Sequence, residues 1–324
     1  MVVFCLTILI VSIFWAVKQP ETNQVEKNLL ATNIRFPKFT ETELIYFDPT
    51  SNSFQEVSFD NLEESTNLLQ LPEGSTPTQV QYADEGEHAL GKLNNLFTFF
   101  DLHEGESSQI NSKGENYTLS PSGSVAYTVR NEDEPYYTSV YIDKDTEPFA
   151  TIDAGYFEWT GGYIELLFLG DDNILFAVEA ESQSGPDWQL LHEGENVAKI
   201  GNAILTESFI ADRNHQDYLL LDRFLGETES FYGIYDFINH EYAKTSIDIK
   251  NNFCKWFDKN HITCLTKDST GLQLGLIDTN TNEYSLIGDI EETDIDFVRN
   301  FHFDQETNTL FMSTETQVYF SKLK

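Results

Sequence analysis

Along most of the chain, short apolar runs alternate with clusters of Asp, Asn, Gly and Ser, and almost no stretch has the period of a helix. Runs of this length, bounded by turn-forming residues, are typical of β-strands. One unit recurs, in which an apolar run, an acidic or His residue and a polar turn lead into a second short strand. Its copies begin at Leu44, Phe97, Ser139, Trp188, Phe231 and Leu272. The pattern predicts an all-β domain built from repeated units.

The spacing of these units indicates how many strands each contains. The turns carry Asp48, Asp101, Asp143, His192, Asp236 and Asp278, at intervals of 42 to 53 residues. A second hairpin lies between each two of them. Two hairpins in 40–50 residues match the four-stranded blades of a β-propeller. A β-helix would have a shorter period, and a β-sandwich of this length would need two domains joined by a linker.

We expect six blades, because six complete units can be counted. In this interpretation the surplus strands Leu44–Phe47 and Phe54–Phe59 complete the last blade, Phe297–Leu323, and remove two exposed sheet edges. Seven blades are the alternative, because residues 59–83 fit none of the six units.

The N-terminus follows a different pattern, since residues 2–17 carry no charged side chain. A helix of about 17–20 apolar residues can span a bilayer. We therefore expect residues 1–18 to form a transmembrane anchor, with a cleaved signal segment as the alternative. Residues 19–38 would form a polar linker and residues 39–324 the propeller.

The flanking charges bear on the orientation of this single-pass anchor. Lys18, Lys27, Arg35 and Lys38 follow the segment and no Lys or Arg precedes it, which by itself favours a cytosolic body. Long domains, however, cross membranes largely regardless of flanking charge. We expect a periplasmic or extracellular body.

The charge balance restricts the partners. The chain has 19 Lys and Arg against 54 Asp and Glu, a net charge of −35. Nucleic-acid binding requires concentrated basic residues, so we exclude it. An acidic surface attracts basic partners. We expect a protein or glycan ligand, and contact with a membrane only through the N-terminal helix.

One hairpin carries a family resemblance. Residues 117–130 read YTLSPSGSVAYTVR, and Pro121, Gly123, Ala126 and Tyr127 match a hairpin motif of TolB-like and WD-repeat-like bacterial propellers. The segment resembles these propellers clearly in this blade only, and the WD dipeptide is absent. The resemblance implies a propeller over about residues 40–310, located in the cell envelope, and it implies no catalytic residues.

Two cysteines lie at equal distances from a predicted turn. Cys254 and Cys264 flank Lys259 by five residues on either side, which places them opposite one another in a hairpin. A directly opposed pair is close enough for a disulfide. Two buried free thiols are the alternative.

Acidic turns raise the question of a metal. Asp143 and Asp145 lie in one such turn, and Asp278 and Asn280 lie in another, where their oxygens could bind Ca²⁺. Neither turn has the glycine and distal glutamate of an EF-hand loop. We therefore expect solvated turns and no cofactor, with Ca²⁺ as the alternative.

Aromatic residues between blades are candidates for ligand binding. Trp159 and Tyr163 lie in an irregular segment where propellers place binding loops. Most other aromatic residues are expected in the core between blades.

No catalytic residue can be assigned, because neither a Gly-x-Ser-x-Gly turn nor a zinc-protease motif is present. We therefore expect a membrane-anchored, non-enzymatic propeller that serves as a scaffold for binding a protein or glycan. The alternative is a propeller hydrolase that acts on glycans or peptides with carboxylates in its central channel.

Overall fold

The structure is a computed structural model, and its regular elements are β-strands. It describes residues 28–110, 114–130, 137–143, 147–153, 163–169, 173–179, 187–192, 195–199, 208–213, 218–225, 229–236, 239, 241–248, 252–258, 260–267, 271–290 and 298–323. Among these residues we find no helix with the length and apolar character needed to cross a bilayer. The expected anchor at residues 1–18 lies outside them and stays a prediction.

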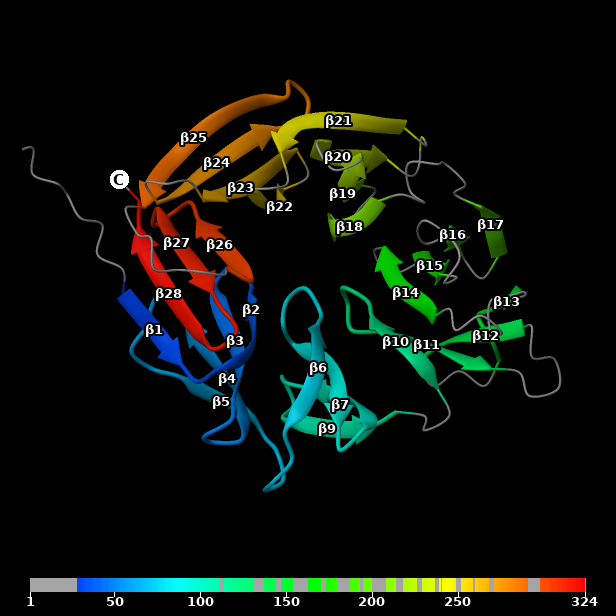
Figure 1. The fold of residues 1–324 in the computed structure, drawn as a ribbon. Coiled ribbons are helices and arrows are strands. Elements are labelled where there is room, and N and C mark those ends of the chain that lie inside the picture. The colour runs from blue at the N-terminus through cyan, green and yellow to red at the C-terminus, as the bar shows by residue number, and fades with distance from the viewer. Residues whose placement is uncertain are drawn as a thin grey trace, which may run out of the picture.

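The described strands form seven antiparallel four-stranded sheets, arranged in a ring like the blades of a propeller (Figure 1). In the first six blades, successive strands run from the centre of the ring to its rim. The first three blades are β2 (Arg35–Phe39), β3 (Glu43–Asp48), β4 (Ser53–Ser58) and β5 (Thr66–Gln70); β6 (Pro77–Tyr82), β7 (His88–Leu93), β8 (Leu96–Asp101) and β9 (Glu106–Gln109); and β10 (Glu115–Leu119), β11 (Val125–Arg130), β12 (Tyr137–Ile142) and β13 (Ala150–Asp153).

The remaining blades follow the same order until the end of the chain. They are β14 (Tyr163–Leu169), β15 (Asn173–Glu179), β16 (Asp187–His192) and β17 (Glu195–Lys199); β18 (Ser208–Arg213), β19 (Tyr218–Leu225), β20 (Glu229–Asp236) and β21 (Glu241–Asp248); β22 (Asn252–Asp258), β23 (His261–Lys267), β24 (Leu272–Asp278) and β25 (Glu283–Ile290); and β26 (Asn300–Asp304), β27 (Thr309–Ser313) and β28 (Gln317–Lys322).

The seventh blade is completed from the other end of the chain. Strand β1 (Asn28–Thr32) pairs antiparallel with β28, with Asn28 opposite Phe320 and Thr32 opposite Gln317. The closing strand thus lies within the stretch expected to be a linker. The strands at residues 44–59 were expected to close the ring, and this expectation is wrong. They belong to the first blade.

The expectation of six blades is corrected to seven sheets in the described part of the chain. The miscount has a specific origin. Asp48 ends the second strand of its blade, whereas Asp101 and Asp278 each end the third strand of theirs. When the turn at Asp48 is aligned with the turns at Asp101 and Asp278, the first repeat unit is displaced by one strand relative to the blade. Residues 59–83, which fitted no unit, contain β5 and β6.

The core lies between blades. Ile45, Phe47 and Phe54 of the first blade pack in one cluster with Ala89 and Phe100 of the second. A strand in such a blade is covered on both faces, which explains why its sequence is a continuous apolar run and not an alternating one.

The ring closes over a similar cluster between the first and last blades. Phe311 of β27 packs in a group with Phe39 of β2, and its ring centroid lies 4.1 Å from that of Phe59. His302 of β26 joins the same group, with its ring 5.4 Å from that of Phe59. A histidine among aromatic rings is poorly hydrated, so its charged form is disfavoured.

Burial, together with the nearby Lys255, lowers the pKa of His302 from 6.5 to about 4, although Asp304 opposes the shift. Because the folded pKa lies below the unfolded one, stability from this residue is complete above about pH 6.5 and is lost as the pH falls towards 4. We expect the loss to reach about 2–3 kcal/mol. Urea unfolding at a series of pH values measures it. In a His302→Phe variant, the free energy of unfolding should depend less steeply on pH between about 6.5 and 4. An equal pH dependence in both proteins would contradict the assignment of this loss to His302.

Candidate functional site

A cleft of about 520 Å³ opens between the second and third blades, next to their innermost strands. The two blades contribute side chains from four strands. The lining residues are Gln79, Gln81, Leu90, Lys92, Phe97, Gly114, Glu115, Asn116 and Tyr117. Concave sites with a few convergent polar groups are the usual places for ligand binding in proteins.

The polar part of the lining combines three amides with one ammonium and one carboxylate. Gln79, Gln81 and Glu115 are exposed, and Lys92 and Asn116 are half-buried. The Glu115 carboxylate also lies 4.0 Å from the Arg130 guanidinium. Amides both donate and accept hydrogen bonds, so this set suits a ligand rich in hydroxyl groups.

The backbone on both walls of the cleft is unusual. Gln79 has a φ of 57° and Asn116 a φ of 49°, and each lies in an irregular part of an inner strand, where pairing with the next strand shifts register. The left-handed region costs a non-glycine residue about 1–3 kcal/mol and persists where the surroundings impose it. Phe36 has a similar φ of 53° in β2, so the bulge is also part of the repeat.

Two of the apolar lining residues, Phe97 and Tyr117, belong to a stack of rings that joins the two blades. Lys92 Nζ lies 4.7 Å from the centroid of the Phe97 ring, and that ring stacks on Tyr117 at 3.8 Å. Tyr117 in turn stacks on Tyr127 at 5.3 Å, and Tyr127 on Tyr141 at 5.6 Å. Phe97 and Tyr117 are each held from both sides, which fixes the position of the cleft wall.

One member of this stack, Tyr117, has a strongly shifted pKa. Burial, with a smaller contribution from Tyr127, raises the pKa of Tyr117 to about 12, although a hydrogen bond with the Gly114 backbone opposes the shift. Its phenol is therefore protonated at neutral pH and can donate a proton or a hydrogen bond.

The predicted ligand-binding residues do not contribute to the described cleft. Trp159 lies outside the described residues. Tyr163 begins β14, the inner strand of the fourth blade, and its side chain also lies outside them. Whether these two residues bind a ligand stays a prediction.

The described candidate Ca²⁺ ligands with a carboxylate, Asp143 and Asp278, accept hydrogen bonds from backbone amides. Asp143 Oδ1 accepts a hydrogen bond of 2.8 Å from the Val125 amide. Asp278 Oδ1 accepts hydrogen bonds from the Asn280 and Thr281 amides, which lower the pKa of Asp278. Asp145 lies outside the described residues. In the described ranges, no group of three or more His, Cys, Asp or Glu side chains is placed to hold a metal ion.

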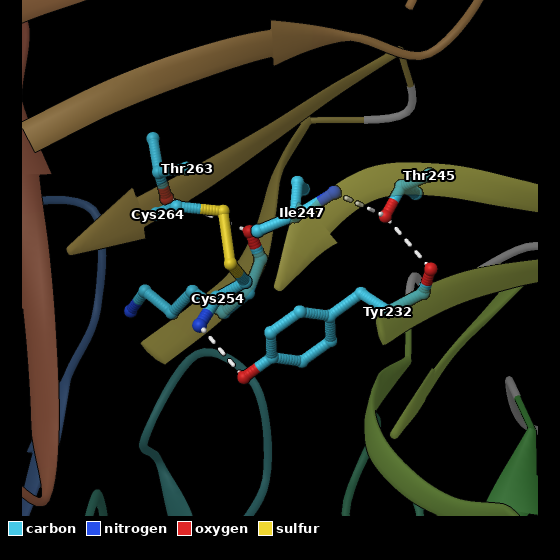
Figure 2. Close-up of a disulfide and its surroundings, with 7 residues drawn as sticks. Tyr232, Thr245, Ile247, Cys254, Thr263 and Cys264 are labelled. Carbon is cyan, nitrogen blue, oxygen red and sulfur yellow. Dashed lines mark hydrogen bonds between the residues drawn. A yellow bond between two sulfur atoms is a disulfide. The ribbon is translucent and has the colours of Figure 1, made fainter. Parts of the chain in front are cut away.

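Cys254 and Cys264 form a disulfide across β22 and β23, with Cα atoms 4.1 Å apart (Figure 2). The hydroxyl of Tyr232, from the fifth blade, accepts a hydrogen bond of 3.4 Å from the Cys254 amide. Thr245 Oγ1 donates to the Tyr232 carbonyl at 2.7 Å. The bridge therefore lies where the fifth and sixth blades pack. It closes a loop of only about ten residues, which corresponds to about 2–3 kcal/mol of stability.

Sequence reasoning missed the cleft. Gln79 and Gln81 lie in residues 59–83, which could not be assigned to a blade, and Lys92 and Glu115 belong to no recognised motif. One usable signal was the polar alternation Gln79-Val80-Gln81 in an otherwise apolar repeat, since an inner strand with exposed amides faces a solvent-filled space.

No protein-family model matches the sequence, and no curated protein matches it. Solved structures do match its fold. An oligogalacturonate lyase, solved in complex with manganese, superposes with a TM-score of 0.64 at 10% identity, and the match covers 94% of this chain and 95% of the lyase.

Two further matches come from peptidases. The β-propeller domain of the trilobed protease from Pyrococcus furiosus matches with a TM-score of 0.53 at 11% identity, over 91% of this chain and 94% of that domain. An acylaminoacyl peptidase from Pyrococcus horikoshii matches with a TM-score of 0.55 at 12% identity, over 90% of this chain but only 51% of the peptidase. These likenesses establish the propeller fold. The narrower TolB-like resemblance stays a prediction.

The matches also correct the expected function. The sequence favoured a non-enzymatic binding scaffold, but the similar solved structures are a lyase and peptidases. This finding contradicts the scaffold interpretation, and at 10–12% identity the likeness itself shows only the fold.

Proposed function

We propose that this chain is a carbohydrate-active propeller enzyme that binds its substrate in the cleft between the second and third blades. The observation that carries the proposal is the lining of that cleft, in which four strands of two blades bring together amides, a Lys–Phe–Tyr stack and a carboxylate. Gln79, Gln81 and Asn116 would hydrogen-bond sugar hydroxyls. The stacked rings would give the cleft a rigid apolar wall.

Two features support a carbohydrate over a peptide. The fold matches the oligogalacturonate lyase over nearly the whole of both chains. In the acylaminoacyl peptidase, by contrast, about half of the chain has no counterpart in these 324 residues. The peptidase likeness therefore concerns a part of that enzyme.

The charged groups of the cleft favour elimination over hydrolysis. Glycoside hydrolases commonly use a pair of carboxylates, and Glu115 is the one carboxylate among the described lining residues. Elimination from a uronic acid needs a cation beside the substrate carboxylate, a base and a proton donor. Lys92, Glu115 and Tyr117 could fill these roles in that order.

The step balances with these three groups. Glu115 removes the proton from the carbon next to the substrate carboxylate, and Lys92 stabilises the negative charge that develops there. The electron pair forms a carbon–carbon double bond as the bond to the leaving sugar oxygen breaks. Tyr117 gives its proton to that oxygen.

A metal ion has no part in this proposal. The similar lyase was solved with manganese, but the described residues of this cleft supply a single carboxylate and no histidine or cysteine. They do not fit a centre that needs several such ligands.

The test is an assay of the purified protein on trigalacturonate, followed by the ultraviolet absorbance of the unsaturated product. Glu115→Gln should lower kcat/KM by about 100-fold or more, because proton transfer by a positioned side chain contributes about 10²–10⁴. Glu106→Gln, an exposed change in β9, is the matched control and should have little effect. Absence of cleavage, or full activity of Glu115→Gln, would contradict the proposal. Cleavage of chromogenic peptides in its place would favour a peptidase.

A further inference from the structure

We infer that Thr128 is a positioning residue that fixes the orientation of the Asn116 amide in the cleft; the ligand-binding part of this inference rests on the proposed function. Thr128 belongs to β11 and is 1% exposed, so it lies behind the cleft wall and cannot contact a ligand itself. Its hydroxyl contacts two consecutive lining residues, namely the backbone carbonyl of Glu115 and the side chain of Asn116.

The hydrogen bonds determine which way the amide faces. Thr128 Oγ1 donates its single proton to the Glu115 carbonyl at 2.9 Å. It can therefore only accept from Asn116, whose Nδ2 lies 3.1 Å away. One proton of the Asn116 NH₂ group is thereby donated to Thr128, which fixes the amide so that Oδ1 occupies its other side as an acceptor.

The same hydroxyl secures the irregular backbone of β10. Glu115 pairs with Thr128 immediately before the register shift, and Asn116 has a φ of 49° within it. Asn adopts this region more readily than most non-glycine residues. By bonding the carbonyl of Glu115 and the side chain of Asn116, Thr128 holds the bulge in one conformation.

A fixed acceptor gives the cleft a preference among ligands. Asn116 Oδ1 can accept a hydrogen bond from a sugar hydroxyl, and a site built for a hydroxyl discriminates against an analogue that lacks it. Because Asn116 is half-buried and not fully enclosed, we expect about 10-fold weaker binding when the amide is free to rotate.

The experiment compares Thr128→Val, which keeps the shape and removes the hydroxyl, with Thr128→Ser, which keeps the hydroxyl. The matched control is Thr98→Val, at a buried threonine whose hydroxyl donates to a local carbonyl, that of Leu96. Binding of trigalacturonate is measured by calorimetry with parent and variants in a Glu115→Gln background, in which the proposed cleavage is suppressed. The Asn116 side-chain NH₂ signals and their hydrogen exchange are measured by NMR with selectively labelled asparagine.

We expect Thr128→Val to bind about 10-fold more weakly and to lose the slow exchange of the Asn116 NH₂ protons, while Thr128→Ser and Thr98→Val resemble the parent. Unchanged Asn116 exchange in Thr128→Val would overturn the inference, as would equal impairment of the serine variant. If the parent binds no saccharide, the proposed function fails. The exchange of Asn116 then still decides whether Thr128 positions it.

Discussion

Phe311→Ala should lower the free energy of unfolding by about 3–5 kcal/mol, the range for truncating a fully buried phenylalanine. Phe311 is 1% exposed and packs between the first and last blades. Its ring lies 4.1 Å from that of Phe59 and 6.1 Å from that of Phe320. The rigid sheets on either side cannot collapse fully into the space, so a cavity adds to the lost burial. Urea unfolding followed by tryptophan fluorescence measures the change.

A second phenylalanine provides the control. Phe253 of β22 is 37% exposed, so Phe253→Ala removes the same atoms from a position with less burial. We expect it to cost about 1 kcal/mol. Equal losses for the two variants would show that the cluster at the ring closure is not tightly packed.

Gly114→Ala should disrupt the wall of the cleft by overpacking it and should cost both stability and activity. A Cβ at this position would lie 2.2 Å from the Tyr117 hydroxyl oxygen and 2.7 Å from Tyr127 Cδ2. Tyr117 cannot move aside easily, because its ring stacks on Phe97 at 3.8 Å. We expect a loss of about 1–3 kcal/mol in stability from overpacking. A misplaced wall should also lower kcat/KM by about 10–100-fold.

The double variant Gly114→Ala with Tyr117→Ala tests whether the loss of stability comes from the clash with Tyr117. Removing the Tyr117 ring relieves the clash with Tyr117 and leaves only the contact with Tyr127. The double variant should therefore be more stable than the sum of the two single changes predicts. Parent-like stability and activity of Gly114→Ala alone would show that the two rings can move apart without altering the cleft.

The repeated four-strand unit could be predicted because burial on both faces leaves a direct trace in the sequence. The strand runs near Phe97, Phe231 and Leu272 correspond to β8, β20 and β24. The number of blades could not be predicted, because a turn at Asp48 resembles one at Asp101 although they end different strands of their blades. Turn residues report local backbone geometry and carry no information on their place in a sheet.

The cleft was beyond sequence reasoning for a different reason. Gln79 and Asn116 lie on different blades and meet only because two inner strands are adjacent in space. Their positive φ values come from bulges, which pairing with the next strand reveals and composition does not. Lys92 and Glu115 are common surface residue types, so neither has a distinctive sequence signal.

The pairing of β1 with β28 has a consequence for biosynthesis. The ribosome makes β1 first, but its partner Phe320 emerges only after nearly the whole domain has been translated. At about 5–20 residues per second, β1 remains without its partner for about 15–60 s. During that interval the nascent chain exposes an unpaired edge at each end of the incomplete ring. We therefore expect this protein to depend on chaperones that bind extended segments until β28 has emerged from the ribosome.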